Sequence, residues 1–202
     1  MSANSIAFNP FATTVAAGLF LTTAAGLVAG TFFDNPAIRY QLSGGVLAAS
    51  ETLPMWGGVA IGEYIPASGQ DVRGSQIKRA TTEANLTGFS VFNQNGAAIS
   101  SPQSPVPQTL SGGQVNFFRL GSGAKLALAI DPALVSDDGG LITQQVSWDF
   151  TNQRIVAYDT VAALPIKILS IQTAGVKTVS YNSGTGAATW ATTGNAAALV
   201  II

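Results

Sequence analysis

The sequence contains no cysteine and no histidine. The absence of cysteine excludes disulfides and thiolate chemistry. The absence of histidine removes both the commonest general base and the commonest zinc ligand. The chain also lacks a G-x-S-x-G nucleophile elbow and a phosphate-binding P-loop. We therefore expect a protein that is not an enzyme and that uses no cofactor or metal.

Charge is also scarce. Charged residues make up 9% of the chain, against roughly 25% in a typical soluble domain. The nine basic and ten acidic residues give a net charge of −1, and no basic run occurs. Nucleic-acid binding needs a patch of Lys and Arg, so we expect no nucleic-acid partner. A surface of neutral polar groups lacks the charge repulsion that keeps monomers apart, which favours a protein covered by neighbours in an assembly.

The first 33 residues carry no charged side chain. Residues 11–33 are long enough to cross a bilayer as a helix. However, they hold several Gly and Thr residues and no basic residue flanks their start, unlike a membrane helix or a signal peptide. We therefore expect an extended apolar arm (residues 1–33) that ends in one or two strands and has no membrane partner. The alternative is a segment used for export or anchoring.

Residues 36–63 combine charge, aromatic mass and turn residues. The pairs Gly44-Gly45 and Gly57-Gly58 predict turns or bulges. The intervening SETLP segment is too polar for a core strand, and its proline cannot donate a ladder hydrogen bond. We expect a loop that presents Met55 and Trp56. Trp56 either fills the core of its own domain or anchors a partner.

Two separate patterns resemble the head-decoration, or cement, proteins of tailed bacteriophages. The first comprises Asp34, Pro36, Ala37, Arg39, Tyr40 and Leu42, followed by GGVLAASETLPMWGGV at residues 44–59. The second comprises PIKILSI at residues 165–171, YNSGTG at residues 181–186, and Trp190. Together the patterns cover about 60 of the 202 residues.

The resemblance implies a largely β virion protein, without catalytic activity, on the outer surface of an assembled capsid. Its partners would be the major capsid protein and other copies of itself, as dimers or trimers at symmetry axes. Arg39, Tyr40, Glu51, Met55 and Trp56 are then the candidate interface residues. Arg39 and Glu51 would supply ion pairs or hydrogen bonds, and Trp56 would be the apolar anchor.

The remaining sequence predicts short strands separated by Gly, Asn and Pro turns. The clearest hairpin joins residues 141–150 to 155–158 because its apolar and polar residues alternate. We also expect strands at 115–120 and 124–130, a hairpin of 176–181 with 187–191, and a terminal strand at 196–202 that must pair to avoid aggregation. The Asp137-Asp138 turn lacks further ligands at calcium-loop spacing.

The expected fold is mainly β, with β-sandwich or β-barrel-like lobes, an extended N-terminal arm and little helix. An N-terminal lobe with a Gly-rich loop would span residues 34–100. A Pro-rich connector (101–108) would separate it from a C-terminal lobe (109–202). The alternative function is a secreted or surface-associated β adhesin or surface-layer-like protein, using its apolar N-terminus for export or anchoring.

Overall fold

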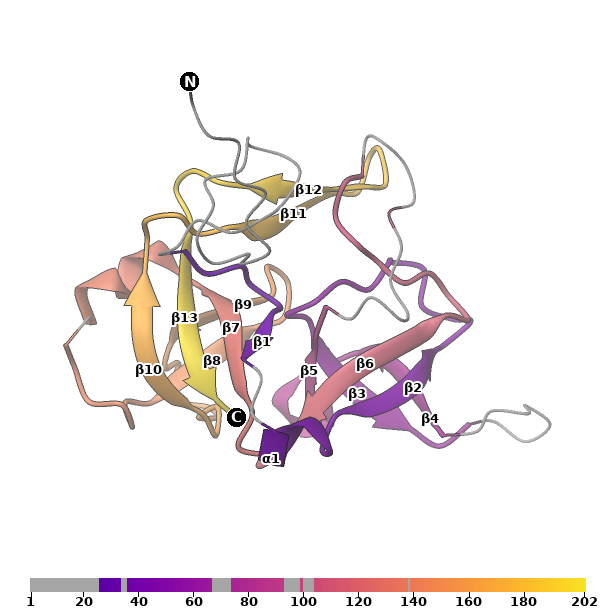
Figure 1. The fold of residues 1–202 in the computed structure, drawn as a ribbon, viewed down its shortest axis with the longest axis horizontal. Coiled ribbons are helices and arrows are strands. Elements are labelled where there is room, and N and C mark those ends of the chain that lie inside the picture. The colour runs from indigo at the N-terminus through magenta and orange to yellow at the C-terminus, as the bar shows by residue number, and fades with distance from the viewer. Residues whose placement is uncertain (1–25, 34–35, 67–73, 93–98, 100–103, 138) are drawn as a thin grey trace, which may run out of the picture.

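The computed structural model describes residues 26–33, 36–66, 74–92, 99, 104–137 and 139–202. Strands account for 44% and helices for 6% of the structure, which confirms the expected mainly-β class. Figure 1 shows a small barrel beside a larger sheet, with a separate two-stranded hairpin above the sheet. The predicted N-terminal arm lies largely outside the described residues.

Five strands close the barrel in the order β2-β4-β3-β5-β6. They are β2 (Ser43–Leu47), β3 (Ala60–Tyr64), β4 (Ser75–Arg79), β5 (Gly88–Ser90) and β6 (Gln114–Arg119). The strands β2 and β4 pair in parallel, and every other pairing is antiparallel. Alternation places Leu47, Ile61, Ile77 and Phe117 inside, where each is fully buried. The short helix α1 (Pro36–Arg39) precedes β2, and the 3₁₀ turn η1 (Glu83–Asn85) joins β4 to β5.

The larger sheet has the strand order β10-β13-β7-β9-β8, and β1 pairs with β7. Its strands are β1 (Phe32–Phe33), β7 (Lys125–Ile130), β8 (Val146–Asp149), β9 (Arg154–Ala157), β10 (Lys167–Gln172) and β13 (Ala196–Ile201). The 3₁₀ helix η2 (Pro132–Asp137) follows β7, and β11 (Thr178–Asn182) pairs with β12 (Ala187–Ala191) as the separate hairpin.

The predicted terminal strand is a central element of this sheet. β13 pairs antiparallel with β10 on one side and with β7 on the other. Its uncharged, apolar sequence suits a strand that is covered on both faces and leaves no free edge. The predicted β8–β9 and β11–β12 hairpins are likewise confirmed.

The change from barrel to sheet lies between Arg119 and Lys125 rather than at the predicted connector 101–108. β6 follows that Pro-rich stretch, yet it closes the barrel against β2 and β5. The predicted strands on either side of Gly121-Ser122-Gly123 are present, but they belong to different sheets and do not pair. The dipeptide Asn95-Gly96, which is typical of a tight hairpin turn, lies outside the described residues.

The barrel and the sheet share one hydrophobic core. A single buried cluster includes Phe89 and Phe118 of the barrel together with Leu128, Trp148 and Val200 of the sheet. The rings of Phe89 and Trp148 meet edge to face at 4.8 Å, a favourable aromatic geometry. The two units are therefore packed as one body. Within the described ranges, no helix is long and apolar enough to span a membrane.

Candidate functional site

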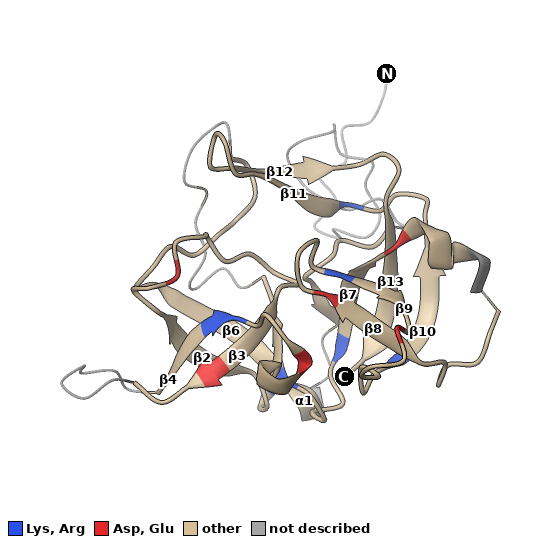
Figure 2. Cartoon of the chain, turned by 180° about the vertical axis from the view of Figure 1, so that it is seen from behind, with Lys and Arg blue, Asp and Glu red and all other residues tan. Residues whose placement is uncertain are grey.

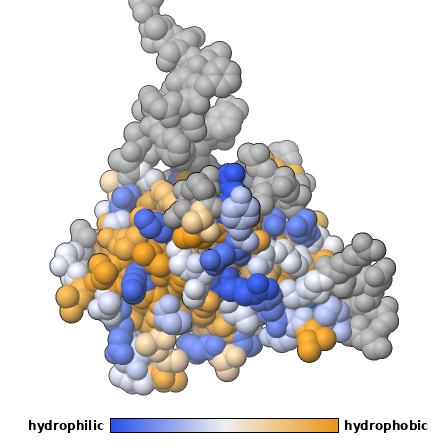
Figure 3. Space-filling view, turned by 60° about the horizontal axis from the view of Figure 1, so that its bottom comes forward, coloured by the Kyte–Doolittle hydropathy of each residue, from blue (hydrophilic) through white to orange (hydrophobic). Residues whose placement is uncertain are grey.

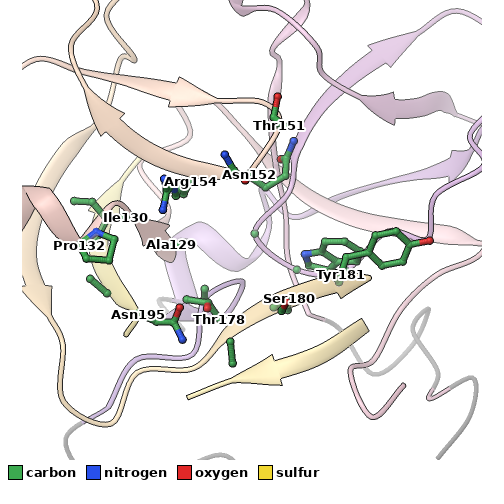
Figure 4. A pocket seen from close by; sticks show the side chains of 18 of the residues that line it. Ala129, Ile130, Pro132, Thr151, Asn152, Arg154, Thr178, Ser180, Tyr181 and Asn195 are labelled. Atoms are coloured by element: carbon green, nitrogen blue, oxygen red, sulfur yellow. The ribbon is translucent and has the colours of Figure 1, made fainter. Parts of the chain in front are cut away.

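A cavity of about 390 Å³ opens where the barrel, the sheet and the β11–β12 hairpin meet. Figure 4 shows Asn152 and Arg154, from the β8–β9 hairpin, facing Thr178 and Asn195 across this hollow, with Tyr181 at one end. Its lining therefore comes from segments far apart in the sequence. We call this hollow the junction cavity.

A close crossing of two backbones positions Trp56 beside the junction cavity. A Cβ on Gly30 would lie 2.2 Å from the carbonyl carbon of Gly57, so the crossing requires glycine. The indole of Trp56 then packs against the ring of Tyr181 on β11, with the ring centroids 5.5 Å apart. The guanidinium of Arg79 lies 4.5 Å from the centroid of the same indole, within cation–π range.

Arg79, at the end of β4, is held by the polar loop that precedes Trp56. Its Nη2 donates to the carbonyl oxygen of Pro54, and its backbone N–H donates to Glu51 Oε2 at 3.0 Å. Burial lowers the pKa of Arg79, while the nearby charge of Glu51 favours the protonated form. Glu51 is therefore used inside the chain, to fix the loop against β4.

Arg154, on the opposite wall, is paired with carboxylates. Its Nη2 lies 2.9 Å from Asp131 Oδ2, and its Nε lies 4.0 Å from Asp149 Oδ2. Desolvation raises the pKa of Asp149, but hydrogen bonds from Asn152 and Thr151, with the charge of Arg154, lower it overall. The pKa of Asp149 beside this wall is therefore held below its ordinary value.

Gln153 links the sheet to the barrel beneath the cavity. Its Oε1 accepts the backbone N–H of Ala60 on β3 at 2.9 Å, and its Nε2 donates to the Phe150 carbonyl at 2.6 Å. Its backbone is left-handed, with φ of 54°, which is unfavourable for a residue with a Cβ. Such strain persists where the surroundings impose it, often at functional sites.

The predicted interface residues do not form one surface, although Glu51 and Trp56 both contact Arg79. Arg39 and Tyr40 lie at the exposed end of α1, where Tyr40 is 92% exposed. Met55 is only 2% exposed in the barrel core and forms an antiparallel bridge with Thr109. Its side chain therefore cannot contact a partner, because the loop folds back onto the barrel instead of presenting it.

Of the two roles expected for Trp56, the structure has the one within its own chain, because its ring packs between the barrel and the β11–β12 hairpin. Its partner Tyr181 lies 125 positions along the chain (181 − 56), a contact that no local pattern indicates. Sequence reasoning likewise missed Arg79, Arg154 and Gln153. The sequence suggested only a solvated loop around Arg79 and a polar turn at residues 151–154 between the two strands of the predicted hairpin.

The sequence contains a Ser-x-x-Lys spacing at residues 75–78, a pattern in which the lysine can act as the base for a serine nucleophile. Ser75 and Lys78 are three apart on β4, so they point to opposite faces of the strand. The hydroxyl of Ser75 donates to Glu63 Oε1 at 2.8 Å, and Lys78 Nζ lies 5.0 Å from the ring centroid of Tyr64. The two side chains are thus not arranged as nucleophile and base.

A second surface follows the outer edge of β10. A groove of about 220 Å³ is lined by Gly139, Gly140, Leu141, Ile142, Gln144 and residues 168–171. We call it the β10 groove. Leu141 is 78% and Ile142 is 51% exposed. On the face shown in Figure 3, apolar groups gather on the left, the side of the larger sheet in Figure 1.

Charges are dispersed over both units, as Figure 2 shows. Within the described part of the chain, no three acidic side chains come together as metal ligands. Comparisons with protein-family models, with curated proteins and with solved structures find no match to this chain.

Proposed function

We propose that the protein is a structural component of a tailed-phage virion that binds the outer surface of the capsid and stabilises the shell. The β10 groove carries this proposal. The resemblance of residues 34–59 and 165–190 to head-decoration proteins and the scarcity of charge support it.

The β10 groove has the chemistry of a protein-binding surface. β10 is an edge strand, since only its β13 side is paired along its length. On its outer side, the Ile168 N–H donates to the Ile142 carbonyl at 3.0 Å. Of the described residues that line the groove, none is charged. An apolar segment bordered by an edge strand is a template for pairing with another chain.

The expected occupant is an uncharged, apolar segment of the major capsid protein. Full burial of Leu141 would contribute about 1.5–3 kcal/mol, and that of Ile142, which is already about half-buried, about half as much. Binding to the assembled shell in preference to free subunits stabilises the shell by linkage, and the effect is repeated at every copy. Arg39 and Tyr40 are candidate additional contacts, since both are exposed. Trp56 and Glu51 act indirectly, by fixing the fold.

The test is occupancy on capsids assembled without this protein. We expect the double variant Leu141→Ser, Ile142→Ser to fold, because both side chains are largely exposed. It should bind capsids roughly fortyfold more weakly or worse, given the burial of two apolar side chains. The matched control is Val161→Ser, which changes an 80% exposed residue outside the groove.

Co-sedimentation followed by quantification of the bound chain measures the occupancy. Wild-type occupancy by the double variant, with the control also at wild-type level, would show that the groove is not the binding surface. Failure of the wild-type chain to bind any such capsid would refute the function itself.

A further inference from the structure

The junction cavity has a lining that the shell-binding role does not use. Its walls carry hydroxyl groups from Thr151, Thr178 and Ser180, and amide groups from Asn152 and Asn195. These groups converge from the β8–β9 turn on one side and from β11 and the start of β13 on the other (Figure 4). Polar groups that converge in a concave site are the usual means of orienting a small ligand.

The charges around the junction cavity are compensated. Arg154 is paired with Asp131 at 2.9 Å and lies 4.0 Å from Asp149. The Glu51 carboxylate accepts a hydrogen bond from the backbone N–H of Arg79. Arg154 has a carboxylate beside its guanidinium, and the charge of Glu51 acts on Arg79, so the site has no strong preference for an anion or a cation. The ligand that fits this lining is polar and uncharged.

Three side-chain nitrogen atoms of residues that line the same cavity have no hydrogen-bond partner among the described residues. The Nε atoms of Arg79 and Arg154 and Nδ2 of Asn195 are buried, and each lacks a hydrogen-bond partner among the described residues. Buried polar atoms without partners are rare and call for an explanation at the site where they gather. Because these atoms are closed off from the surface of the cavity, the choice of ligand rests on the hydroxyl and amide groups that line it.

One end of the junction cavity is aromatic. Trp56 and Tyr181 are half-buried and pack together there. An aromatic ring next to hydrogen-bonding groups suits a ligand with both C–H faces and hydroxyl edges. The left-handed Gln153 lies in the same lining and ties it to the barrel, so the walls are held in place before any ligand arrives.

We propose that the junction cavity binds a neutral saccharide. A sugar hydroxyl donates and accepts at once, which matches a lining of hydroxyls, amides and paired charges. Its apolar C–H face matches the aromatic end. The volume of about 390 Å³ falls within the range of roughly 300–1,000 Å³ of small-ligand sites. The site is remote from the β10 groove in its residues, so failure of this proposal would leave the shell-binding proposal intact.

The experiment uses the full chain and a panel of maltose, cellobiose, lactose and N,N′-diacetylchitobiose. Saturation-transfer NMR detects binding, and calorimetry measures the affinity of any disaccharide that binds. Sodium sulfate and sodium glutamate serve as charged competitors. We expect saturable binding of at least one disaccharide and no competition by either salt.

Two variants locate the binding. Ser180→Trp places a large side chain at an exposed strand position in the lining and should abolish binding. Thr143→Trp makes the same change at an exposed residue outside the lining and should leave binding unchanged. Asn195→Ala removes an amide group from the lining and should weaken binding roughly three- to tenfold, the contribution of one hydrogen bond.

If none of the four disaccharides binds, the proposal of a neutral-saccharide site is overturned. Displacement by sulfate or glutamate would overturn the assignment of an uncharged ligand. Binding that survives Ser180→Trp, with that variant folded by circular dichroism, would show that the saccharide lies elsewhere.

Discussion

Gln153 offers the sharpest test of how the barrel is fixed to the sheet. Its Oε1 is the acceptor for the backbone N–H of Ala60, a residue with no exposed surface. In Gln153→Ala that N–H loses its acceptor, which costs about 1–3 kcal/mol for a buried donor. Loss of the hydrogen bond to the Phe150 carbonyl adds about 1 kcal/mol.

The expected loss is therefore about 2–4 kcal/mol in the free energy of unfolding. For a chain of this size, each kcal/mol lowers Tm by about 2–4 °C. Gln153→Gly loses the same hydrogen bonds but relieves the left-handed backbone, so we expect it to be about 1 kcal/mol less destabilised than Gln153→Ala. Urea unfolding followed by tryptophan fluorescence, together with calorimetry, measures both variants.

The control is Gln145→Ala, which removes an exposed glutamine just before β8 and should change stability by less than about 0.5 kcal/mol. The reasoning is refuted if Gln153→Ala unfolds with the same free energy as this control. It is also refuted in part if the glycine variant is the less stable of the two, since the backbone at this position would then not be strained.

Three further predictions concern other contacts. Trp56→Ala should lower the free energy of unfolding by about 2–4 kcal/mol, because the indole loses its packing on Tyr181. The pKa of Glu63 is lowered chiefly by its hydrogen bonds with Arg119, so its stabilisation is complete above its ordinary value of 4.5 and is lost as pH falls through the lower, folded-state pKa. The unfolding free energies of wild type and Glu63→Gln should therefore converge on acidification from neutral pH. Gly88→Ala should cost about 3 kcal/mol or more, because the added Cβ would lie 2.1 Å from a backbone oxygen of β6.

Each of these has its own control. Tyr181→Phe, which keeps the ring, should retain most of the stability that Trp56→Ala loses. A constant difference between wild type and Glu63→Gln from neutral pH to about pH 2 would contradict the linkage argument. Gly112→Ala is the control for Gly88→Ala, since no atom lies within 4 Å of its added Cβ. Any stability that Gly112→Ala loses should come only from the left-handed backbone at that residue, where φ is 81°.

The strands could be predicted where the local pattern carried enough information. The β8–β9 hairpin alternates apolar with polar residues, and the polar turn between its strands is short. The uncharged C-terminal segment was expected to pair with other strands, and β13 is paired with β10 on one side and with β7 on the other. The domain boundary could not be predicted, because β6 joins the barrel by hydrogen bonds to β2 and β5, which lie far earlier in the chain.

The candidate sites depend almost wholly on such distant contacts. The sequence indicated that Trp56 sits on a loop between glycine pairs, but not whether it faces inward or outward. Its direction is set by the crossing of Gly30 with Gly57 and by the ring of Tyr181. Met55 was predicted to be available to a partner and is instead in the barrel core, because an apolar side chain gains more from burial than from a loop position.

Composition and short-range pattern by themselves determined the β class, most of the strands and the poverty of ionic and nucleophilic groups, because each depends on residue type and on neighbours along the chain. Tertiary structure alone decided where the barrel ends, which aromatic rings meet, and which distant segments enclose the junction cavity. The physical reason is that strand pairing and ring packing join positions far apart in the chain, such as Trp56 with Tyr181 and Val28 with Lys177. The pairing register and the closure of the barrel, rather than local propensity, select those partners.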